Sequence, residues 1–173
     1  KEWDYYYIGN RDWGLALTIS DVSFLGVVSA SFLDFHKPSQ INKSVPTPFP
    51  MGNFRMPPSP EIGDVSRKIG NSSLSITNDG ERRHLFGKFP NFNPVKEDFE
   101  VDITLSEPPE EYMFIATPFH KKKHFYYNAK INCLKAKGYV KLGEKKYSAD
   151  DALGTLDWGR GVWTYDNTWY WGS

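Results

Sequence analysis

The sequence predicts an all-β protein, folded as an antiparallel β-barrel or sandwich. Apolar and polar residues alternate along several short segments, the pattern of strands with one buried face. Apolar residues never keep helical spacing for three turns. Turn-forming residues separate the segments, so about nine to eleven short strands are expected, and that number is typical of barrels and sandwiches.

The opening residues 1–35 predict a three-stranded meander. Residues 13–19 alternate large apolar side chains with small ones, and residues 5–8 form a partner strand across the turn at Gly9-Asn10. Residues 24–35 carry β-favouring side chains on both faces. This predicts a central strand that is buried on both sides.

Residues 36–61 contain seven of the twelve prolines. Proline restrains φ and lacks an N–H donor, so neither sheet nor helix is expected in this segment. Long loops of this kind are usually lids, binding loops or linkers. The segment carries apolar side chains that would cover a pocket, and a packed surface loop is an equal alternative. These side chains are Phe49, Met51, Phe54 and Met56.

The remainder predicts more strands and one turn of helix. Asn78-Asp79-Gly80 is a hairpin turn, because Asp-Gly suits the positive φ angles of tight turns. Ser148 and Asp151 have the spacing of a capping box, which predicts a single helical turn. The expected strands share period-two alternation or lie in hairpin pairs: residues 74–76, 82–86, 99–105, 113–117, 125–127 and 134–142.

Composition excludes several kinds of partner. Equal counts of 21 basic and 21 acidic residues leave no net charge to attract nucleic acid, and no apolar run approaches the length of an integral membrane segment. Cys133 is the only cysteine, which favours a cytoplasmic location. A phosphate-binding loop, a nucleophile elbow and a Cys-x-x-Cys pair are all missing, so no cofactor is expected. His120 and His124 lack a clear third ligand, so no metal site is expected either.

The most informative stretch is residues 152–173, which holds four of the six tryptophans. Within it Asp157 and Arg160 lie three residues apart, where an unpaired charge would be costly. They are the catalytic candidates, with Asp157 as proton donor or acceptor and Arg160 as its orienting partner or an anion clamp. A purely structural ion pair between them is an equal alternative. Gly159 and Gly161 indicate close chain approach.

The aromatic residues of this stretch are the candidate ligand-binding side chains. They are Trp158, Trp163, Tyr165, Trp169 and Trp171. If residues 161–172 form one strand, all of them except Trp158 share a face. If residues 165–168 form a turn instead, two short strands face each other, and a different set of these aromatic residues shares a face.

The pattern D-x-x-R-G-x-W-x-Y-x-x-x-W-x-W, which begins at Asp157, is similar to the signature of a widespread family of uncharacterised proteins. The opening Trp3-Asp4-Tyr5-Tyr6 resembles that family's start. More remotely the chain resembles AttH-like proteins, acyclic-carotenoid hydratases, tocopherol cyclases and lipocalin-like Diels-Alderases. The resemblance implies a longer protein of two lipocalin-like barrels, in which residues 1–173 form the first and residues 157–173 lead towards the second.

Barrel and aromatic residues together predict a pocket for a hydrophobic, isoprenoid or polyketide-like small molecule. The remote relatives imply a hydratase, cyclase or isomerase, although their Asp and Trp-Gly motif is matched here only approximately. One alternative is a carbohydrate-binding module in which Trp163, Trp169 and Trp171 stack on sugars; another is a structural or interaction domain. An exposed flat aromatic strip would favour sugar, and an enclosed cavity would favour a lipophilic ligand. The residues leave the oligomeric state open.

Overall fold

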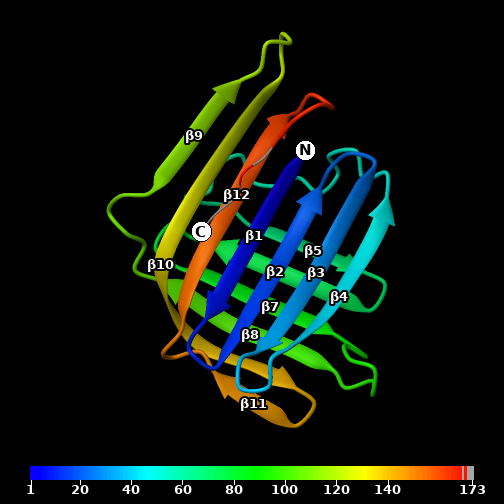
Figure 1. Cartoon of the computed structure of the whole chain (residues 1–173), viewed down its shortest axis with the longest axis vertical. Helices are drawn as coiled ribbons and strands as arrows, with labels where there is room; N and C mark the ends of the chain where they lie inside the picture. The colour runs from blue at the N-terminus through cyan, green and yellow to red at the C-terminus, as the bar shows by residue number, and fades with distance from the viewer. Residues whose placement is uncertain (169, 171–173) are drawn as a thin grey trace.

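Twelve antiparallel strands form one sheet that curls into a nearly closed barrel (Figure 1). The computed structural model describes residues 1–168 and 170. No helix occurs in these residues, and therefore none that is long and apolar enough to cross a membrane. The all-β prediction is confirmed.

The strands follow the alternating segments of the sequence. They are β1 (Glu2–Gly9), β2 (Trp13–Asp21), β3 (Leu25–Asp34), β4 (Ser39–Pro48), β5 (Val65–Ile69), β6 (Ser72–Asn78), β7 (Arg83–Phe89), β8 (Phe99–Ser106), β9 (Met113–Pro118), β10 (Phe125–Leu142), β11 (Lys145–Ser148) and β12 (Leu153–Val162). The expected hairpins β1–β2, β6–β7 and β9–β10 are all present.

Strand order departs from chain order around β12 and β10. The sheet runs β4-β3-β2-β1-β12-β10-β8-β7-β6-β5, with β9 and β11 paired to β10. The last strand, β12, therefore lies between the first strand and β10. At the open side of the barrel β3 and β4 approach β5.

Side chains fill the interior of the barrel. Alternate residues of β2, β3 and β8 point inward, and Leu17, Val28 and Ile103 are fully buried. Phe32 joins this core to Phe99 and Tyr147, with ring centroids 5.9 and 4.9 Å away respectively. The core is packed, so space for a ligand has to be sought on the outer faces and at the barrel ends.

Two expectations about the N-terminal half are wrong. The chain from Ser39 to Pro48 forms strand β4 although it contains prolines. Edge strands tolerate proline where the missing N–H would point to solvent, and β4 is at the sheet edge. Strand β3 is not buried on both sides, because only alternate residues are buried and the others stay partly exposed.

The expected helical turn at residues 148–151 is also wrong. The Asp150 N–H donates to Ser148 Oγ at 3.2 Å, so Ser148 does satisfy a local donor. The Ala152 N–H then donates to the Ala149 carbonyl at 3.0 Å, which closes a tight turn instead of starting a helix. Gly154 follows at once inside β12, and the strand pairing of this segment prevails over its weak helical preference.

A β-bulge divides β10 into two halves that pair with different strands. The register with β12 shifts between Ile131 and Leu134, and Cys133 has a φ of 62°. Before the bulge β10 pairs with β9, and after it with β8 and β11. The half from Phe125 to Ile131 stands beside β12 and supplies part of the candidate site.

Candidate functional site

Asp157 and Arg160 lie on opposite faces of β12. The strand is regularly paired with β1 from Leu153 to Arg160, so residues an odd number apart point to opposite sides. The expectation that the two side chains pair with each other is therefore wrong. Each has its own oppositely charged partner, on its own face of the sheet.

On the outer face, Asp157 accepts three hydrogen bonds from neighbouring strands. Lys130 Nζ donates at 2.5 Å, Asn128 Nδ2 at 2.6 Å and the Trp3 indole Nε1 at 3.2 Å. The Asp157 and Lys130 side chains are only 7% and 10% exposed. A charged pair this deeply buried costs several kcal/mol to break by removing one partner.

Gly159 and Gly161 let β12 pack closely against aromatic and backbone atoms. A Cβ on Gly159 would lie 2.3 Å from two atoms of the Trp3 indole. One on Gly161 would lie 2.4 Å from the Phe125 carbonyl oxygen. The missing side chains therefore allow Trp3 to lie flat over β12 with its N–H on Asp157.

Three aromatic side chains cluster beside the Asp157–Lys130 pair. Trp3 stacks on Trp163 with ring centroids 5.1 Å apart, and Tyr126 lies 6.3 Å from Trp3 and 5.7 Å from Trp163. Burial raises the pKa of Tyr126 to about 12, and the negative charge of Asp157 adds to the shift. The Tyr126 hydroxyl is therefore a neutral group at physiological pH.

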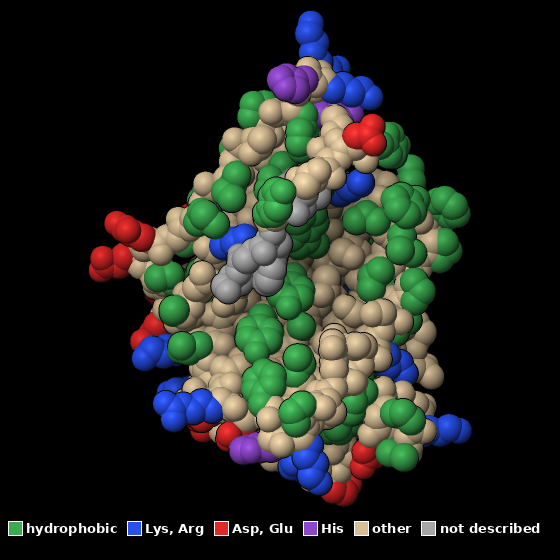
Figure 2. Space-filling model, viewed as in Figure 1, with side chains coloured by type: hydrophobic (Ala, Val, Ile, Leu, Met, Phe, Trp, Pro, Cys, Tyr) green, Lys and Arg blue, Asp and Glu red, His purple; other side chains and the backbone are tan. Residues whose placement is uncertain are grey.

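These groups line a cleft of about 850 Å³ on the outer surface of the barrel. Its walls are β1, β9, β10, β12 and the segment that follows β12. Many of the lining side chains are apolar or aromatic, among them Trp3, Met113, Ile115, Phe119, Tyr126, Trp163 and Tyr165, and the charged members are Lys1, Lys130 and Asp157. Figure 2 shows hydrophobic side chains gathered on this face.

The candidate ligand-binding aromatics divide between several environments. Trp163 and Tyr165 line the cleft, although Tyr165 is fully exposed. Trp158 faces the core instead, where it is 1% exposed and packs edge-on against Tyr127 at 5.3 Å. Trp169 and Trp171 lie outside the described residues. The segment after Val162 leaves the sheet, so a single strand does not extend through residues 161–168.

On the inner face, Arg160 fastens a loop to the end of the barrel. Its Nη1 lies 2.9 Å from Asp4 Oδ1, and its Nε and Nη2 donate to the Pro57 carbonyl at 3.1 and 2.8 Å. Its guanidinium also stacks 4.4 Å from the Trp158 ring centroid. Burial raises the pKa of Asp4, and the Arg160 charge opposes that rise. Arg160 therefore acts within the core and does not line the outer cleft.

A second buried arginine holds the same loop. Arg83 is 2% exposed and donates from Nη2 to the Pro60 carbonyl at 3.0 Å. Asn78 Nδ2 donates to the same oxygen at 3.1 Å. Arg83 and Arg160 together hold residues 57–60 across the end of the barrel, and we call this segment the stopper.

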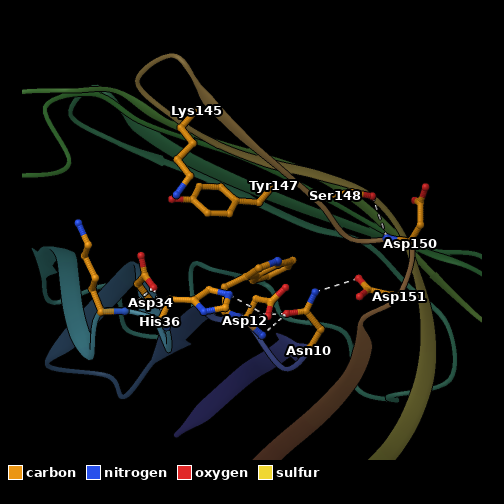
Figure 3. Close-up of a pocket in the computed structure, with 11 residues that line it drawn as sticks. Asn10, Asp12, Asp34, His36, Lys145, Tyr147, Ser148, Asp150 and Asp151 are labelled. Atoms are coloured by element: carbon orange, nitrogen blue, oxygen red, sulfur yellow. Dashed lines mark hydrogen bonds and ion pairs between the residues drawn. The ribbon is translucent and has the colours of Figure 1, made fainter.

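Another pocket, of about 790 Å³, lies at the opposite end of the barrel (Figure 3). Asp12 pairs with His36 at 3.0 Å, and Asp34 accepts the His36 N–H at 2.9 Å. Asp151 accepts a hydrogen bond from Asn10 at 2.8 Å. These polar groups already hold the surrounding loops in place, so the outer cleft is the better candidate for a ligand.

Trp3, Asn128 and Lys130 are site residues that the C-terminal signature does not indicate. They come from β1 and β10, and only the pairing of both strands with β12 brings them to Asp157. Asn128 and Lys130 are polar residues at alternate positions of a strand segment whose other members include Ala129 and Ile131. In the sequence, that alternation indicates a strand with one polar face, but it does not indicate that this strand pairs with β12.

The fold is similar to that of a Nitrosomonas europaea protein provisionally assigned as AttH, with a TM-score of 0.59 and 14% sequence identity. The similarity covers 95% of this chain and 52% of that one, so this chain spans about half the length of the Nitrosomonas protein. No curated protein matches the sequence. The likeness to AttH is confirmed for the fold, whereas the likeness to the hydratases, cyclases and Diels-Alderases stays an expectation. Matching over residues 1–173, the chain belongs to the family described as a domain of unknown function, DUF2804.

Proposed function

We propose that the outer cleft binds a hydrophobic small molecule that carries at least one hydrogen-bonding group. Apolar walls with a few polar groups at defined positions are typical of small-molecule sites. Here Met113, Ile115 and Phe119 form one wall and the Trp3–Trp163 stack another. The observation that carries the proposal is the buried Asp157–Lys130 pair at the edge of this aromatic cleft.

The shape of the cleft supports a flat or extended apolar ligand, such as an isoprenoid or a polyketide-like ring system. Aromatic faces contact planar or polyene groups over a large area. The polar end of the ligand would lie near Lys130 and Asp157, which supply a donor and an acceptor. The volume of about 850 Å³ is within the usual range for a drug-sized molecule.

Chemistry on the ligand is a further step of the same proposal. Asp157 is the candidate proton acceptor or donor, and Lys130 holds its charge in place. Arg160 would contribute indirectly, because its bonds to Asp4 and Pro57 position β1 and the stopper and do not reach the cleft. A hydratase, cyclase or isomerase reaction is consistent with a single proton-transferring group beside an apolar ligand.

Carbohydrate binding is the second candidate, favoured by one observation. Tyr165 and Tyr170 are almost fully exposed next to Trp163, and exposed aromatic rings are suited to stacking on sugars. Trp3 and Trp163, however, already cover each other's faces. This arrangement leaves less free ring surface than a sugar platform needs.

The test is to isolate the full-length protein from its own host and look for a retained small molecule by native mass spectrometry. Farnesol and cellohexaose then serve as probes of the two ligand classes in tryptophan fluorescence titrations. Trp163→Ala should weaken farnesol binding by on the order of 10-fold, the value of one aromatic contact. Phe86→Ala, on the outer face of β7, is the matched control and should leave binding unchanged.

Binding of cellohexaose but not farnesol would replace the lipophilic ligand by a sugar. Farnesol binding that survives Trp163→Ala would move the site away from the cleft. Failure of both probes, together with no retained molecule, would leave the aromatic cluster with a structural role.

A further inference from the structure

Three loops at one end of the barrel are free of acidic side chains and rich in apolar and basic ones. They are residues 22–24, 49–56 and 119–124, and we call them the basic-apolar end. Phe24, Phe49 and Met51 are 61%, 71% and 68% exposed. Exposed large apolar side chains in one place usually mark an interaction surface.

Two loops of the basic-apolar end are hydrogen-bonded to each other, and the β9–β10 turn lies at the same end of the barrel (Figure 1). The Phe49 N–H donates to the Phe24 carbonyl and the Met51 N–H to the Ser23 carbonyl, both at 3.0 Å. Ser23, Met51 and Phe125 also line a common surface pocket of about 410 Å³, whose charged members are Lys1, Glu2, Asp21, Arg55 and Arg160. Phe125 directly follows the β9–β10 turn, which forms the top of the molecule in Figure 1.

The apolar tips are held outward by a buried scaffold. Asp21 is 2% exposed and accepts N–H bonds from Ser23 and Gly52, each at 2.9 Å. Phe49 and Met51 have φ angles of 49° and 53°, a conformation that non-glycine residues rarely adopt. Such strain persists only where the surrounding structure imposes it. The exposure of Phe49 and Met51 is therefore built into the loop.

The basic-apolar end carries several basic side chains in its loops. Arg55, Lys121, Lys122 and Lys123 belong to the basic-apolar end, and Figure 2 shows Lys, Arg and His side chains at its tip. The pocket at the opposite end is of mixed charge, with the aspartates Asp12, Asp34, Asp150 and Asp151 beside His36, Lys37 and Lys145. A chain with no net charge thus carries a local positive surface next to its exposed apolar tips.

We propose that the basic-apolar end docks on the surface of an anionic phospholipid bilayer. Phe24, Phe49 and Met51 would enter the headgroup region while the lysines contact lipid phosphates and carboxylates. This combination fits a lipid surface better than nucleic acid, because Phe24, Phe49 and Met51 are large apolar side chains that stay exposed beside the basic ones. Phe119, in the β9–β10 turn, also lines the outer cleft, so a lipophilic ligand has a short path from bilayer to cleft. The docking itself does not depend on the proposed function.

Flotation of the full-length protein with phosphatidylcholine vesicles, with and without phosphatidylserine, tests the docking. Binding should require phosphatidylserine and fall as salt rises. Replacing Lys121, Lys122 and Lys123 together by Gln should weaken binding by on the order of 100-fold. Phe49→Ser with Met51→Ser should weaken it by on the order of 10-fold.

The matched control is Val95→Ser with Lys96→Gln, an exposed apolar and basic pair in the loop between β7 and β8 at the far end. This variant should bind vesicles as the unmodified protein does. Absence of flotation with phosphatidylserine would overturn the proposal, as would equal losses in the control variant. Equal affinity for an RNA or DNA oligonucleotide would show a general polyanion surface and would overturn it too.

Discussion

The two faces of β12 use the same five residues, 157–161, for different purposes. On the inner face Arg160 pairs with Asp4, packs on Trp158 and holds the stopper, all within the core. On the outer face Asp157 pairs with Lys130 beside the cleft. Charged residues three apart in a strand look like one constellation in the sequence, yet strand parity assigns them to separate environments. Only the outer pair lines the cleft, whereas Arg160 lines a separate, smaller surface pocket.

The largest expected effect is on the inner face. Arg160→Met keeps the length of the side chain but leaves Asp4 as a buried charge without its ion-pair partner. We expect a loss of about 3 to 5 kcal/mol in unfolding free energy, measured by urea denaturation. Asp4→Asn combined with Arg160→Met should recover part of the loss, and ligand affinity per folded molecule should stay unchanged. Loss of affinity without loss of stability would contradict the separation of the two faces.

On the outer face, Asp157→Asn should affect both stability and binding. Lys130 would lose its carboxylate partner, at a cost of about 3 kcal/mol, the low end for a broken buried pair because Lys130 lies close to the cleft. Affinity for the cleft ligand should fall as well, in contrast to the Arg160 variant. If turnover is found, this change should abolish it while the protein remains folded. Unchanged affinity and turnover would make the outer pair purely structural.

Gly159→Ala tests whether Trp3 depends on the missing side chain. The added methyl group would overlap the indole, so we expect a loss of about 1 to 3 kcal/mol, typical of overpacking. Thermal unfolding of Gly159→Ala, of Trp3→Ala and of the variant with both changes completes a double-mutant cycle. The methyl group should cost much less once the indole is gone. Additive losses would show that Trp3 does not lie over Gly159.

The smallest effect is spectroscopic and depends on pH. Because the pKa of Tyr126 in the folded protein is about 12, above the ordinary 10.0, folding favours the neutral phenol. This contribution to stability is complete below pH 10 and is lost as pH rises towards 12. In an ultraviolet titration, Tyr126→Phe should therefore lack one phenol that ionises at high pH in the unmodified protein. Asp157→Asn should lower the pKa of Tyr126, and no change in either variant would contradict its place beside Asp157.

Much of the fold could be predicted, because alternation is a local property that the residues of each strand display. The site could not, since its geometry depends on which strands pair. Asp157 meets Lys130 across a register set by β10 and β12, and it meets Trp3 across more than 150 residues of chain. Strand β4 was missed for a related reason: proline excludes a central strand, but whether a segment lies at an edge is decided by the whole sheet.

The pairing of β1 with β12 also has a consequence for biosynthesis. Glu2 lies opposite Arg160, so β1 waits for β12 before its second edge is paired. During translation β1 and β10 both present open edges, and Asp4 and Lys130 are made before Arg160 and Asp157, with which they pair. Closure at such long sequence separation is slow, and open edges invite pairing with other chains. The nascent protein is therefore most vulnerable to aggregation in the interval before β12 leaves the ribosome.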